Sequence, residues 1–402
     1  MSLVIVSDPH IGEYSYGRTD PTTGLNTRLL DLLNNFDQTI TYAIDVKAAA
    51  YIIVGDIYRV KHPNSKIRKQ FASKLKRLIK ANILVILMTG NHDMTATSDG
   101  AHAMSEMEEL SDLIDNLTIV SSPQIIPVND DELYLLPFVN RGEQGLLTPQ
   151  EFLEYQRKCI DDFNLKTNKS RFKNKLFFGH FGTDKSVIGN SFDLDMSDNE
   201  HENKVSLSAF DGGDWTKVYL GHIHKQQEFN KIARHVGSLC RVDFTEEKEQ
   251  KGFYHYNKGL DQFIHLDDRQ FLTLELKLLD ENYKTTLVDF QTMLNDLNDN
   301  DKLKTAIVKL KVDVLQTYYT AIKLDRIESF LRENCWHFTG ASINVSSKEV
   351  IDDNVSKITN IDAPDEALKK FVDKHSDRFK DIKDKMVDKG IDILKQVKSF
   401  RS

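Results

Sequence analysis

The sequence predicts an α/β protein in which buried strands alternate with amphipathic helices. Short apolar and β-branched runs are separated by longer segments whose apolar residues recur at helical spacing, as in sheets covered by helices. After about residue 260, leucine or valine alternates with polar residues, which is typical of a half-buried sheet. With 402 residues, the chain has room for more than one domain. We expect a first domain over residues 1–260, a small α/β domain over 261–350 and a C-terminal helix over 362–402.

The first domain is expected to contain short buried strands and longer helices with one apolar face. We expect strands at residues 3–6, 51–54, 83–88, 133–138, 176–178, 218–220, 234–236 and 252–256, the later ones continuing the same sheet. We expect helices at residues 26–47, from 64 or 65 to 81, and 148–164. Asn64 or Ser65 can cap the second helix, because either side chain accepts hydrogen bonds from the free N–H groups at a helix start.

The small second domain is expected to have the order β-α-β-α-β. Its strands are expected at residues 272–278, 308–314 and 342–345, and its helices at 287–297 and 319–334. No cluster of residues of the metal-ligand type occurs in this stretch of sequence. We therefore expect this domain to lie beside the chemistry and not to perform it.

Two further segments have alternative interpretations. Residues 191–203 are polar, acidic and without periodicity, so they form either a plain surface loop or a loop that touches substrate. In the helix expected over 362–402, apolar residues recur mostly every three or four positions. This apolar stripe packs either on the protein's own body or on a helix of a partner.

Composition limits the class of protein. The net charge of −8 gives no overall basic signature of nucleic-acid binding, although a local basic strip or bound cations can still act. The three cysteines, Cys159, Cys240 and Cys335, are far apart and odd in number, so we expect reduced, buried thiols. The N-terminus leads directly into a strand, with no basic start and no long apolar region, and no apolar run approaches ~20 residues. We expect a cytoplasmic protein without a membrane span.

Five short polar motifs follow predicted strands of the first domain. They are Asp8-Pro9-His10, Gly55-Asp56, Gly90-Asn91-His92-Asp93, Gly179-His180 and Gly221-His222-Ile223-His224. Taken singly they are weak, since the first is also compatible with a simple strand-end turn and the second is nearly uninformative. Together they supply seven potential ligands, all Asp, Asn or His and none Cys: Asp8, His10, Asp56, Asn91, His180, His222 and His224. This set favours harder divalent ions such as manganese, magnesium or iron over a structural zinc.

The motifs are expected to meet at one edge of the fold, because α/β sheets place their sites at the carboxyl ends of the strands. A carboxylate can bridge two cations about 3.5–4 Å apart, and such a pair clamps a phosphoryl group and activates water. Asp56 is the natural bridge, since it is the lone strong ligand of its motif. The sequence therefore predicts two metal ions and a phosphate-containing substrate.

The ordered pattern D-x-H, G-D, G-N-H-D, G-H, G-H-x-H resembles the calcineurin-like metallophosphoesterases, which implies a β-sandwich flanked by helices. By this resemblance, one ion is held by Asp8, His10, Asp56 and His224, and the other by Asp56, Asn91, His180 and His222. The resemblance makes His92 a catalytic residue and not a ligand. It would face the scissile phosphate and assist the leaving oxygen by hydrogen bonding or proton donation.

Further segments resemble the SbcD family, the nuclease subunits of double-strand-break processing complexes. These segments are Asp8-Pro9-His10-Ile11-Gly12, Gly55-Asp56-Ile57-Tyr58 with Pro63 nearby, Gly237-Ser238 through Phe244, and Lys251-Gly252-Phe253. The resemblance is strong to about residue 260 and looser afterwards, and the compact length suits a phage-type recombination endonuclease subunit.

Membership of that family would imply a DNA exonuclease and endonuclease with two divalent ions, Mn²⁺ as first choice and Mg²⁺ or Fe²⁺ as alternatives. Residues 261–350 would be the DNA-capping domain. The helix over 362–402 would bind the coiled coil of an SMC-like ATPase of the SbcC type. The nuclease would act as a homodimer within a heterotetramer.

One position departs from the family pattern. Three residues after Asp56 the family commonly has Asp or His, which can orient the catalytic histidine, whereas this chain has Arg59. A guanidinium cannot accept a hydrogen bond from imidazole. Either another acceptor, with His62 as a candidate, orients His92, or Arg59 contacts the phosphate backbone instead.

The candidate DNA-binding residues are Arg59, Lys61 and His62. They belong to a basic run that continues with Lys66, Arg68 and Lys69. Such a run neutralises phosphates, or it is simply the solvated face of a helix. The acidic balance of the whole chain predicts weak DNA binding by this subunit alone.

Two other functions compete with the nuclease. The first is a stand-alone phosphodiesterase or phosphatase for a small molecule or a phosphoprotein. Protein phosphatases of this fold carry G-D-x-x-D-R-G at the second motif, which residues 55–61 do not match. The second is an assembly subunit with structural metals, against which the complete ligand set and His92 argue.

Overall fold

The structure is a computed structural model that describes residues 2–95, 101–139, 145, 148–187, 204–320, 322–346 and 388–389. The chain divides into two compact units, Met1–Asp313 with Ile322–Asn344, and Val314–Ala321 with Val345–Ser402. The segment 191–203 lies outside the described residues, as does the helix expected over 362–402 except for residues 388–389. Among the described residues, no helix combines the length and the apolar character that crossing a bilayer requires.

The first six-stranded sheet contains the strands that carry the first three motifs. Its order is β12 (Leu260–His265), β11 (Gly252–Asn257), β1 (Ser2–Val6), β2 (Ala50–Ile53), β3 (Leu84–Met88) and β4 (Leu117–Val120). Strands β1 to β4 pair in parallel, with Val4 opposite Tyr51, and β11 pairs with β1 antiparallel. The parallel register brings the carboxyl ends of β1, β2 and β3 to one edge.

A second six-stranded sheet carries the last two motifs. Its order is β5 (Gln124–Val128), β6 (Asp131–Leu136), β7 (Asn174–His180), β8 (Lys217–Gly221), β10 (Ala233–His235) and β9 (Gln227–Glu228). The expectation that residues 133–138, 176–178, 218–220 and 234–236 continue the first sheet is therefore wrong. Only the strand near 252–256 returns to the first sheet, as β11.

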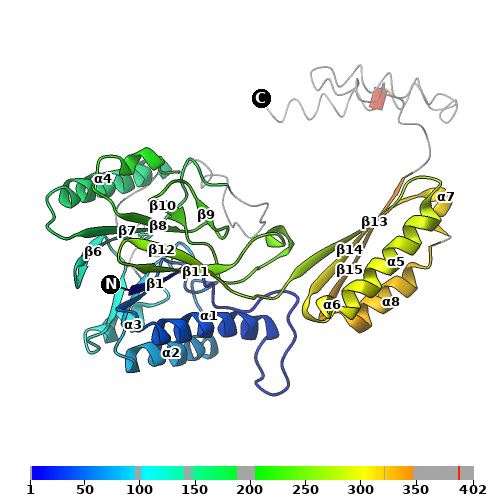
Figure 1. The fold of residues 1–402 in the computed structure, drawn as a ribbon, viewed down its shortest axis with the longest axis horizontal. Helices are drawn as coiled ribbons and strands as arrows, with labels where there is room; N and C mark the ends of the chain where they lie inside the picture. Colours follow the sequence, from blue (N-terminus) through cyan, green and yellow to red (C-terminus); the bar gives the residue numbers. More distant parts are fainter. Residues whose placement is uncertain are drawn as a thin grey trace. The chain divides into compact units, whose positions relative to one another are not determined.

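Alternating side chains show why two sheets form. Leu3 and Ile5 of β1 share an apolar cluster with Phe178 and Tyr219 of the second sheet. Val4 and its neighbours on the opposite face pack against helices. Each central strand is thus buried on both faces, which yields a sandwich of helix, sheet, sheet and helix layers (Figure 1).

The helices of the sandwich are α1 (Thr27–Asp45), α2 (Ser65–Lys80), α3 (Ser105–Ser111) and α4 (Pro149–Thr167), with short 3₁₀ turns at Leu207–Phe210 and Phe244–Glu246. Helices α1 and α2 cover the first sheet, and α4 covers the second. Asn64, not Ser65, caps α2, because its side chain accepts from the Ile67 N–H at 3.0 Å. Thr148 and Glu151 form a capping box at the start of α4.

A separate three-stranded sheet has the order β13 (Phe271–Leu278), β14 (Ile307–Leu315) and β15 (His337–Ser346). Its helices are α5 (Tyr283–Asp299), α6 (Lys302–Thr305), α7 (Gln316–Tyr319) and α8 (Leu324–Asn334). The helix expected at 319–334 is present from Leu324 to Asn334 as α8, but its expected start is wrong, because α7 ends at Tyr319. Lys323 has φ −86° and ψ 67°, outside the helical region, and Ile322 beside it is buried.

Candidate metal centre

The turns that follow the strands place the ligand residues in an unusual backbone conformation. Asp8, His10, Asp56 and His222 have φ angles of 49°, 42°, 51° and 79°. This left-handed region is uncommon for residues with a side chain and tends to occur at functional sites. Hydrogen bonds hold the turns: the His10 N–H donates to the Asp56 carbonyl at 3.0 Å, and the Asp8 N–H to the Gly55 carbonyl at 3.3 Å.

Glycine is required at two positions beside these turns. Gly55 has φ +85°, and a Cβ added there would lie 2.1 Å from His180 Nδ1. A Cβ at Gly90 would lie 2.1 Å from Asp56 Oδ1. The glycines of the second and third motifs therefore let the ligand side chains approach the backbone closely.

The first group of donor atoms comes from β1 and β8. His10 Nε2 lies 2.9 Å from His224 Nε2 and 3.9 Å from Asp8 Oδ1. The Asp8 carboxylate also accepts from the His222 N–H, at 3.1 and 3.2 Å. Asp8, His10 and His224 form one of the groups able to hold a cation.

The second group comes from β2, β3, β7 and β8. Asn91 Oδ1 lies 3.2 Å from His180 Nε2 and 3.1 Å from His222 Nδ1. Asp56, His180 and His222 form a further group able to hold a cation. The other nitrogen of the His180 ring, Nδ1, lies 2.8 Å from the Val54 carbonyl oxygen, and this contact fixes the orientation of the ring.

Asp56 lies between the two groups. Its Oδ2 is 3.4 Å from His10 Nε2, and its Oδ1 is 3.3 Å from His180 Nε2. Each oxygen of one buried carboxylate thus faces a different group, as a bridging ligand requires. All seven residues that the motifs supplied are brought together.

The donor set fits divalent cations. Nitrogen and oxygen atoms converge at short range, and two imidazole Nε2 atoms face each other at 2.9 Å. Burial, helped by the nearby His180 ring, lowers the pKa of His222 to about 3, and burial also holds the pKa of His10 well below its usual range. Both rings are therefore neutral at pH 7, which is the form that binds a metal. Although burial lowers the pKa of His180, the Asp56 charge raises it to about 9, so cation binding there must release a proton.

Asp93 ends the third motif and organises the loops around the centre. Its carboxylate accepts from the N–H groups of Ile57 and Tyr58 at 3.0 Å and of Gly90 at 2.9 Å. Burial, with the nearby Asp56 charge, raises the pKa of Asp93 to about 6. The sequence contains this residue in its motif but assigns it no role.

His92 is not among the seven, although with His10 and Asp56 it forms a third group of side chains able to hold a cation. Its ring centroid is 4.8 Å from that of His10, and its main-chain N–H donates to Asp56 Oδ1 at 2.9 Å. Its Nδ1 lies 3.2 Å from the main-chain carbonyl oxygen of Arg59. Position 59 therefore supplies an acceptor through its backbone, whereas the candidate substitute His62 is exposed.

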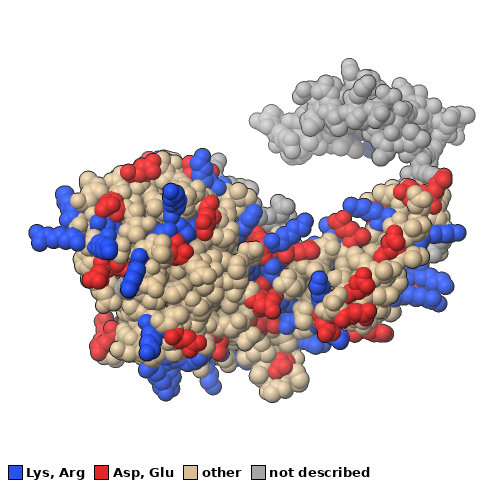
Figure 2. Space-filling view, viewed as in Figure 1, with Lys and Arg blue, Asp and Glu red and all other residues tan. Residues whose placement is uncertain are grey.

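The basic run after the second motif is partly engaged within the chain. The Arg59 guanidinium lies 4.1 Å from the Tyr14 ring centroid and donates to the Glu13 carbonyl at 2.9 Å. Lys66 donates to the Gly24 carbonyl, and Arg68 pairs with Glu106. Lys61 is exposed, like His62. Figure 2 shows basic and acidic side chains interspersed over the face in view, without a continuous basic stripe among the described residues.

Two buried residues near the centre were given no role from the sequence. Glu246 Oε1 lies 2.8 Å from His224 Nδ1, and Lys251 Nζ lies 2.9 Å from Glu246 Oε2. Glu246 is 0% exposed and Lys251 is 2% exposed. Lys251 belongs to a segment that resembles the SbcD family, and Glu246 lies between that segment and the similar Gly237–Phe244 stretch.

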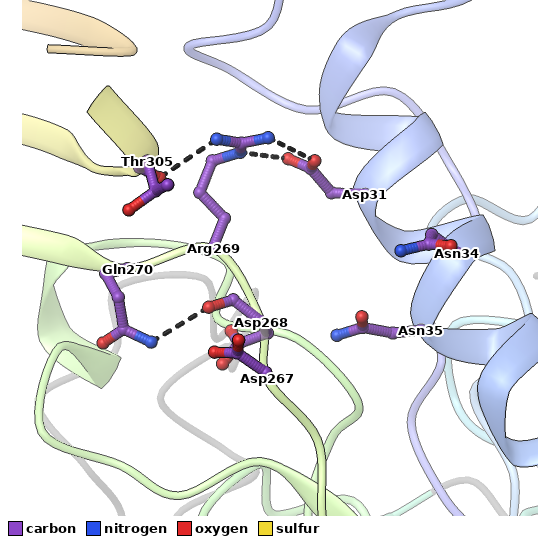
Figure 3. Close-up of a pocket in the computed structure, with 8 residues that line it drawn as sticks. All are labelled: Asp31, Asn34, Asn35, Asp267, Asp268, Arg269, Gln270 and Thr305. Carbon is purple, nitrogen blue, oxygen red and sulfur yellow. Dashed lines mark hydrogen bonds and ion pairs between the residues drawn. The ribbon is translucent and has the colours of Figure 1, made fainter. Parts of the chain in front are cut away.

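A polar cavity of about 260 Å³ lies apart from these ligands. Its walls are Asp31, Asn34, Asn35, Asp267, Asp268, Arg269, Gln270 and Thr305, and include none of the seven donors (Figure 3). The Arg269 guanidinium donates to both carboxylate oxygens of Asp31, at 2.5 and 2.6 Å, and to the Thr305 carbonyl at 3.0 Å. These contacts tie α1 to the segments that precede β13 and β14.

Comparisons with known proteins agree with this geometry. A model of the family described as calcineurin-like phosphoesterase matches residues 1–226. The DNA double-strand break repair protein Mre11 of Methanocaldococcus jannaschii is 24% identical over 291 residues, which cover 69% of this chain and 70% of that protein. The Archaeoglobus fulgidus protein of the same name is 23% identical over 347 residues, covering 80% of this chain and 72% of the relative.

A solved structure gives a weaker likeness. The dimetal phosphatase from Danio rerio is 13% identical, with a TM-score of 0.40 over 63% of this chain and 91% of that chain, and it supports no conclusion. The family model spans more than half of the sequence. The chain therefore belongs to the calcineurin-like phosphoesterase family and is a metal-dependent phosphoesterase.

Proposed function

We propose that this chain is a DNA nuclease that hydrolyses phosphodiester bonds, with exonuclease and endonuclease activity, as the nuclease subunit of an SbcCD-like double-strand-break processing complex. The observation that supports this most is the convergence of seven N and O donors around Asp56, with His92 beside them. The choice of DNA as substrate draws on relatives named as DNA double-strand break repair proteins.

We assign one ion to Asp8, His10, Asp56 and His224, and the other to Asp56, Asn91, His180 and His222. Mn²⁺ suits a mixed set of carboxylate, amide and imidazole donors, and Mg²⁺ or Fe²⁺ are the alternatives. Bound there, the ions would supply Lewis-acid stabilisation of a phosphoryl group and an activated water. The protein's part is to fix the seven donors on buried strand ends, so that little reorganisation is needed when substrate arrives.

His92 is proposed to act on the leaving oxygen of the phosphodiester. A carbonyl oxygen only accepts hydrogen bonds, so the contact with Arg59 places a hydrogen on Nδ1 of His92. Nε2 then remains for the substrate, and it can donate a proton to the leaving oxygen only when the ring carries a hydrogen on both nitrogens. Proton donation from a positioned histidine is worth about 10²–10⁴ in rate.

The remaining assignments are proposals of the same kind. Residues 261–350 would position DNA, residues 362–402 would bind an SMC-like ATPase, and the chain would be a homodimer within a cytoplasmic heterotetramer. Among the candidate DNA contacts, exposed Lys61 and His62 have free access to a phosphate backbone. Arg59 would reach it only by exchanging its contact with the Glu13 carbonyl.

The purified protein is expected to degrade linear double-stranded or single-stranded DNA when Mn²⁺ is supplied. His92→Ala should lower the rate by at least about 10² with the fold and ion binding intact. His265→Ala is a matched control, because this histidine is exposed on β12. Cleavage of small phosphodiesters, together with inertness towards DNA with and without the ATPase, would favour the stand-alone phosphodiesterase instead.

A further inference from the structure

We infer that Glu246 is a positioning residue that holds His224 in its ligating orientation, and that residues 243–249 anchor this contact to the three-stranded sheet. We call residues 243–249 the linking segment. The inference rests on the proposed metal centre and adds to it a route by which the sheet β13-β14-β15 influences one of the two ions.

The contact between Glu246 and His224 fixes which ring nitrogen faces the cation. Glu246 Oε1 lies 2.8 Å from His224 Nδ1, and a carboxylate at that position accepts a hydrogen from Nδ1. Nε2 is then left with its lone pair, and Nε2 is the atom that faces His10 at 2.9 Å. Carboxylates that hold metal-binding histidines in this way orient the ring and raise its basicity.

The Glu246 carboxylate is itself held on its second oxygen. Oε2 accepts from the Val242 N–H at 3.0 Å and lies 2.9 Å from Lys251 Nζ. Lys251 also contacts Glu249 Oε2 at 2.9 Å and donates to the His224 carbonyl at 3.2 Å. The buried carboxylate of Glu246 therefore has a buried counter-charge, which offsets the cost of removing its charge from solvent.

The opposite side of the linking segment is attached to the three-stranded sheet. Glu247 accepts from the Thr273 N–H at 2.9 Å and from its hydroxyl at 2.6 Å. The Phe244 ring packs edge-on against Phe271 of β13, with centroids 5.0 Å apart. Lys309 of β14 places its ammonium 4.1 Å from the Phe244 ring centroid.

These two sets of contacts belong to neighbouring residues. Phe244 and Glu247 face the sheet, while Glu246 faces the metal centre. The segment between them is a single 3₁₀ turn that Asp243 caps by accepting from the Thr245 N–H at 2.6 Å. Because the turn is short and capped, a shift of β13 displaces Glu246, and a charge-assisted hydrogen bond weakens when its partners move apart.

The test measures ion binding directly in the full chain, by calorimetric titration with Mn²⁺ and by the visible absorption of bound Co²⁺. Glu246→Ala is expected to weaken one of the two ions by about 10–100-fold and to leave the other unchanged. Glu246→Gln should restore much of the affinity, because its amide oxygen still accepts from Nδ1. A purely structural role for Glu246 would lower the melting temperature without this selective loss and without rescue by glutamine.

The attachment of the linking segment to the three-stranded sheet is tested by Glu247→Ala. The Glu247 side chain does not contact a proposed metal ligand. The substitution should weaken the same ion as Glu246→Ala does, by a smaller factor. The matched control is Glu275→Ala, because Glu275 lies on the same strand as Thr273, is exposed and forms its ion pair with exposed Lys277, at 3.0 Å.

Wild-type affinities for both ions in Glu246→Ala and Glu246→Gln would overturn the positioning role. Wild-type affinity in Glu247→Ala would overturn the link to the sheet. Failure of the wild-type protein to bind Mn²⁺ would overturn this inference together with the proposed function. Normal ion binding without DNA cleavage would count against the nuclease proposal alone.

Discussion

The Nδ1 atom of His92 lies 3.2 Å from the main-chain carbonyl oxygen of Arg59. The backbone, and not the side chain, thus meets the hydrogen-bonding need that an acidic or imidazole side chain would otherwise serve at position 59. The Arg59 side chain is left to pack over Tyr14, at 4.1 Å from the ring centroid.

Arg59→Ala is therefore expected to retain DNA cleavage within about threefold of wild type on short substrates, because the carbonyl remains in place. His92→Ala, in contrast, should lose at least about 10² in rate. Single-turnover cleavage at saturating Mn²⁺ compares the two variants. A loss in Arg59→Ala as large as in His92→Ala would mean that the guanidinium contributes to the chemistry.

Asp56→Asn is expected to weaken both ions by at least about tenfold each, because removing a ligand costs at least as much as removing a group that supports one. The asparagine keeps the size of the side chain and can still accept from the His92 N–H, so the fold should survive. Calorimetric titration with Mn²⁺ measures the change, with exposed Asp211→Asn as control. Loss of one ion only would show that Asp56 does not bridge.

Gly55→Ala should lower the free energy of unfolding through two effects, and Gly259→Ala isolates one of them. Both glycines have positive φ, +85° and +90°, which costs an alanine about 1–2 kcal/mol. At Gly55 the new Cβ would also lie 2.1 Å from His180 Nδ1, whereas at Gly259 it meets no described atom within 4 Å. Urea unfolding should show a larger loss for Gly55→Ala, and equal losses would contradict the close approach.

His235 predicts a pH-dependent part of the stability. Burial lowers its pKa to about 4, and its ring lies 2.7 Å from Ser186 Oγ and 3.3 Å from the Leu220 carbonyl oxygen. Between pH 4 and about 6.5 the unfolded chain binds a proton here that the folded chain does not, so stability falls as pH falls. From pH 7 to pH 5 this one group should cost about 2 kcal/mol.

Replacing His235 with glutamine should remove that share of the loss. Urea unfolding at pH 7 and pH 5 compares the two proteins, and the quantity of interest is the difference between their pH slopes. Other buried histidines with a lowered pKa, such as His222, contribute to the pH dependence of stability in both proteins. An unchanged slope in His235→Gln would contradict the lowered pKa.

Much of the fold follows from local pattern. The apolar runs at residues 3–6 and 83–88 are strands because their side chains are buried on both faces, and Asn64 caps α2 because of its polar oxygen. Local pattern did not predict which strands belong to which sheet, since a strand buried on both faces reads the same in either sheet, whereas the resemblance to the calcineurin-like metallophosphoesterases correctly implied a β-sandwich. Strand β5 was also missed, because Pro127 interrupts a half-buried edge strand.

The candidate site was likewise predictable only in part from the sequence. The seven donors were identified because each motif follows a strand, and order along the chain is visible in a sequence. Glu246 was not, because its contact with His224 joins residues 22 positions apart through the packing of a turn. The acceptor for His92 is a carbonyl oxygen, which every residue has, so no residue type at position 59 could reveal it.

The left-handed turns at Asp8, His10, Asp56 and His222 limit how this centre can change during evolution. Aspartate, asparagine and histidine are the residues with a side chain that enter this backbone region most readily, and they are also the residues that offer oxygen or imidazole ligands. A substitution that suits the turn but not the ion, such as glycine, deletes a ligand. A substitution that suits neither both strains the backbone and deletes the ligand. Backbone geometry and coordination chemistry therefore favour the same few residue types at these four positions.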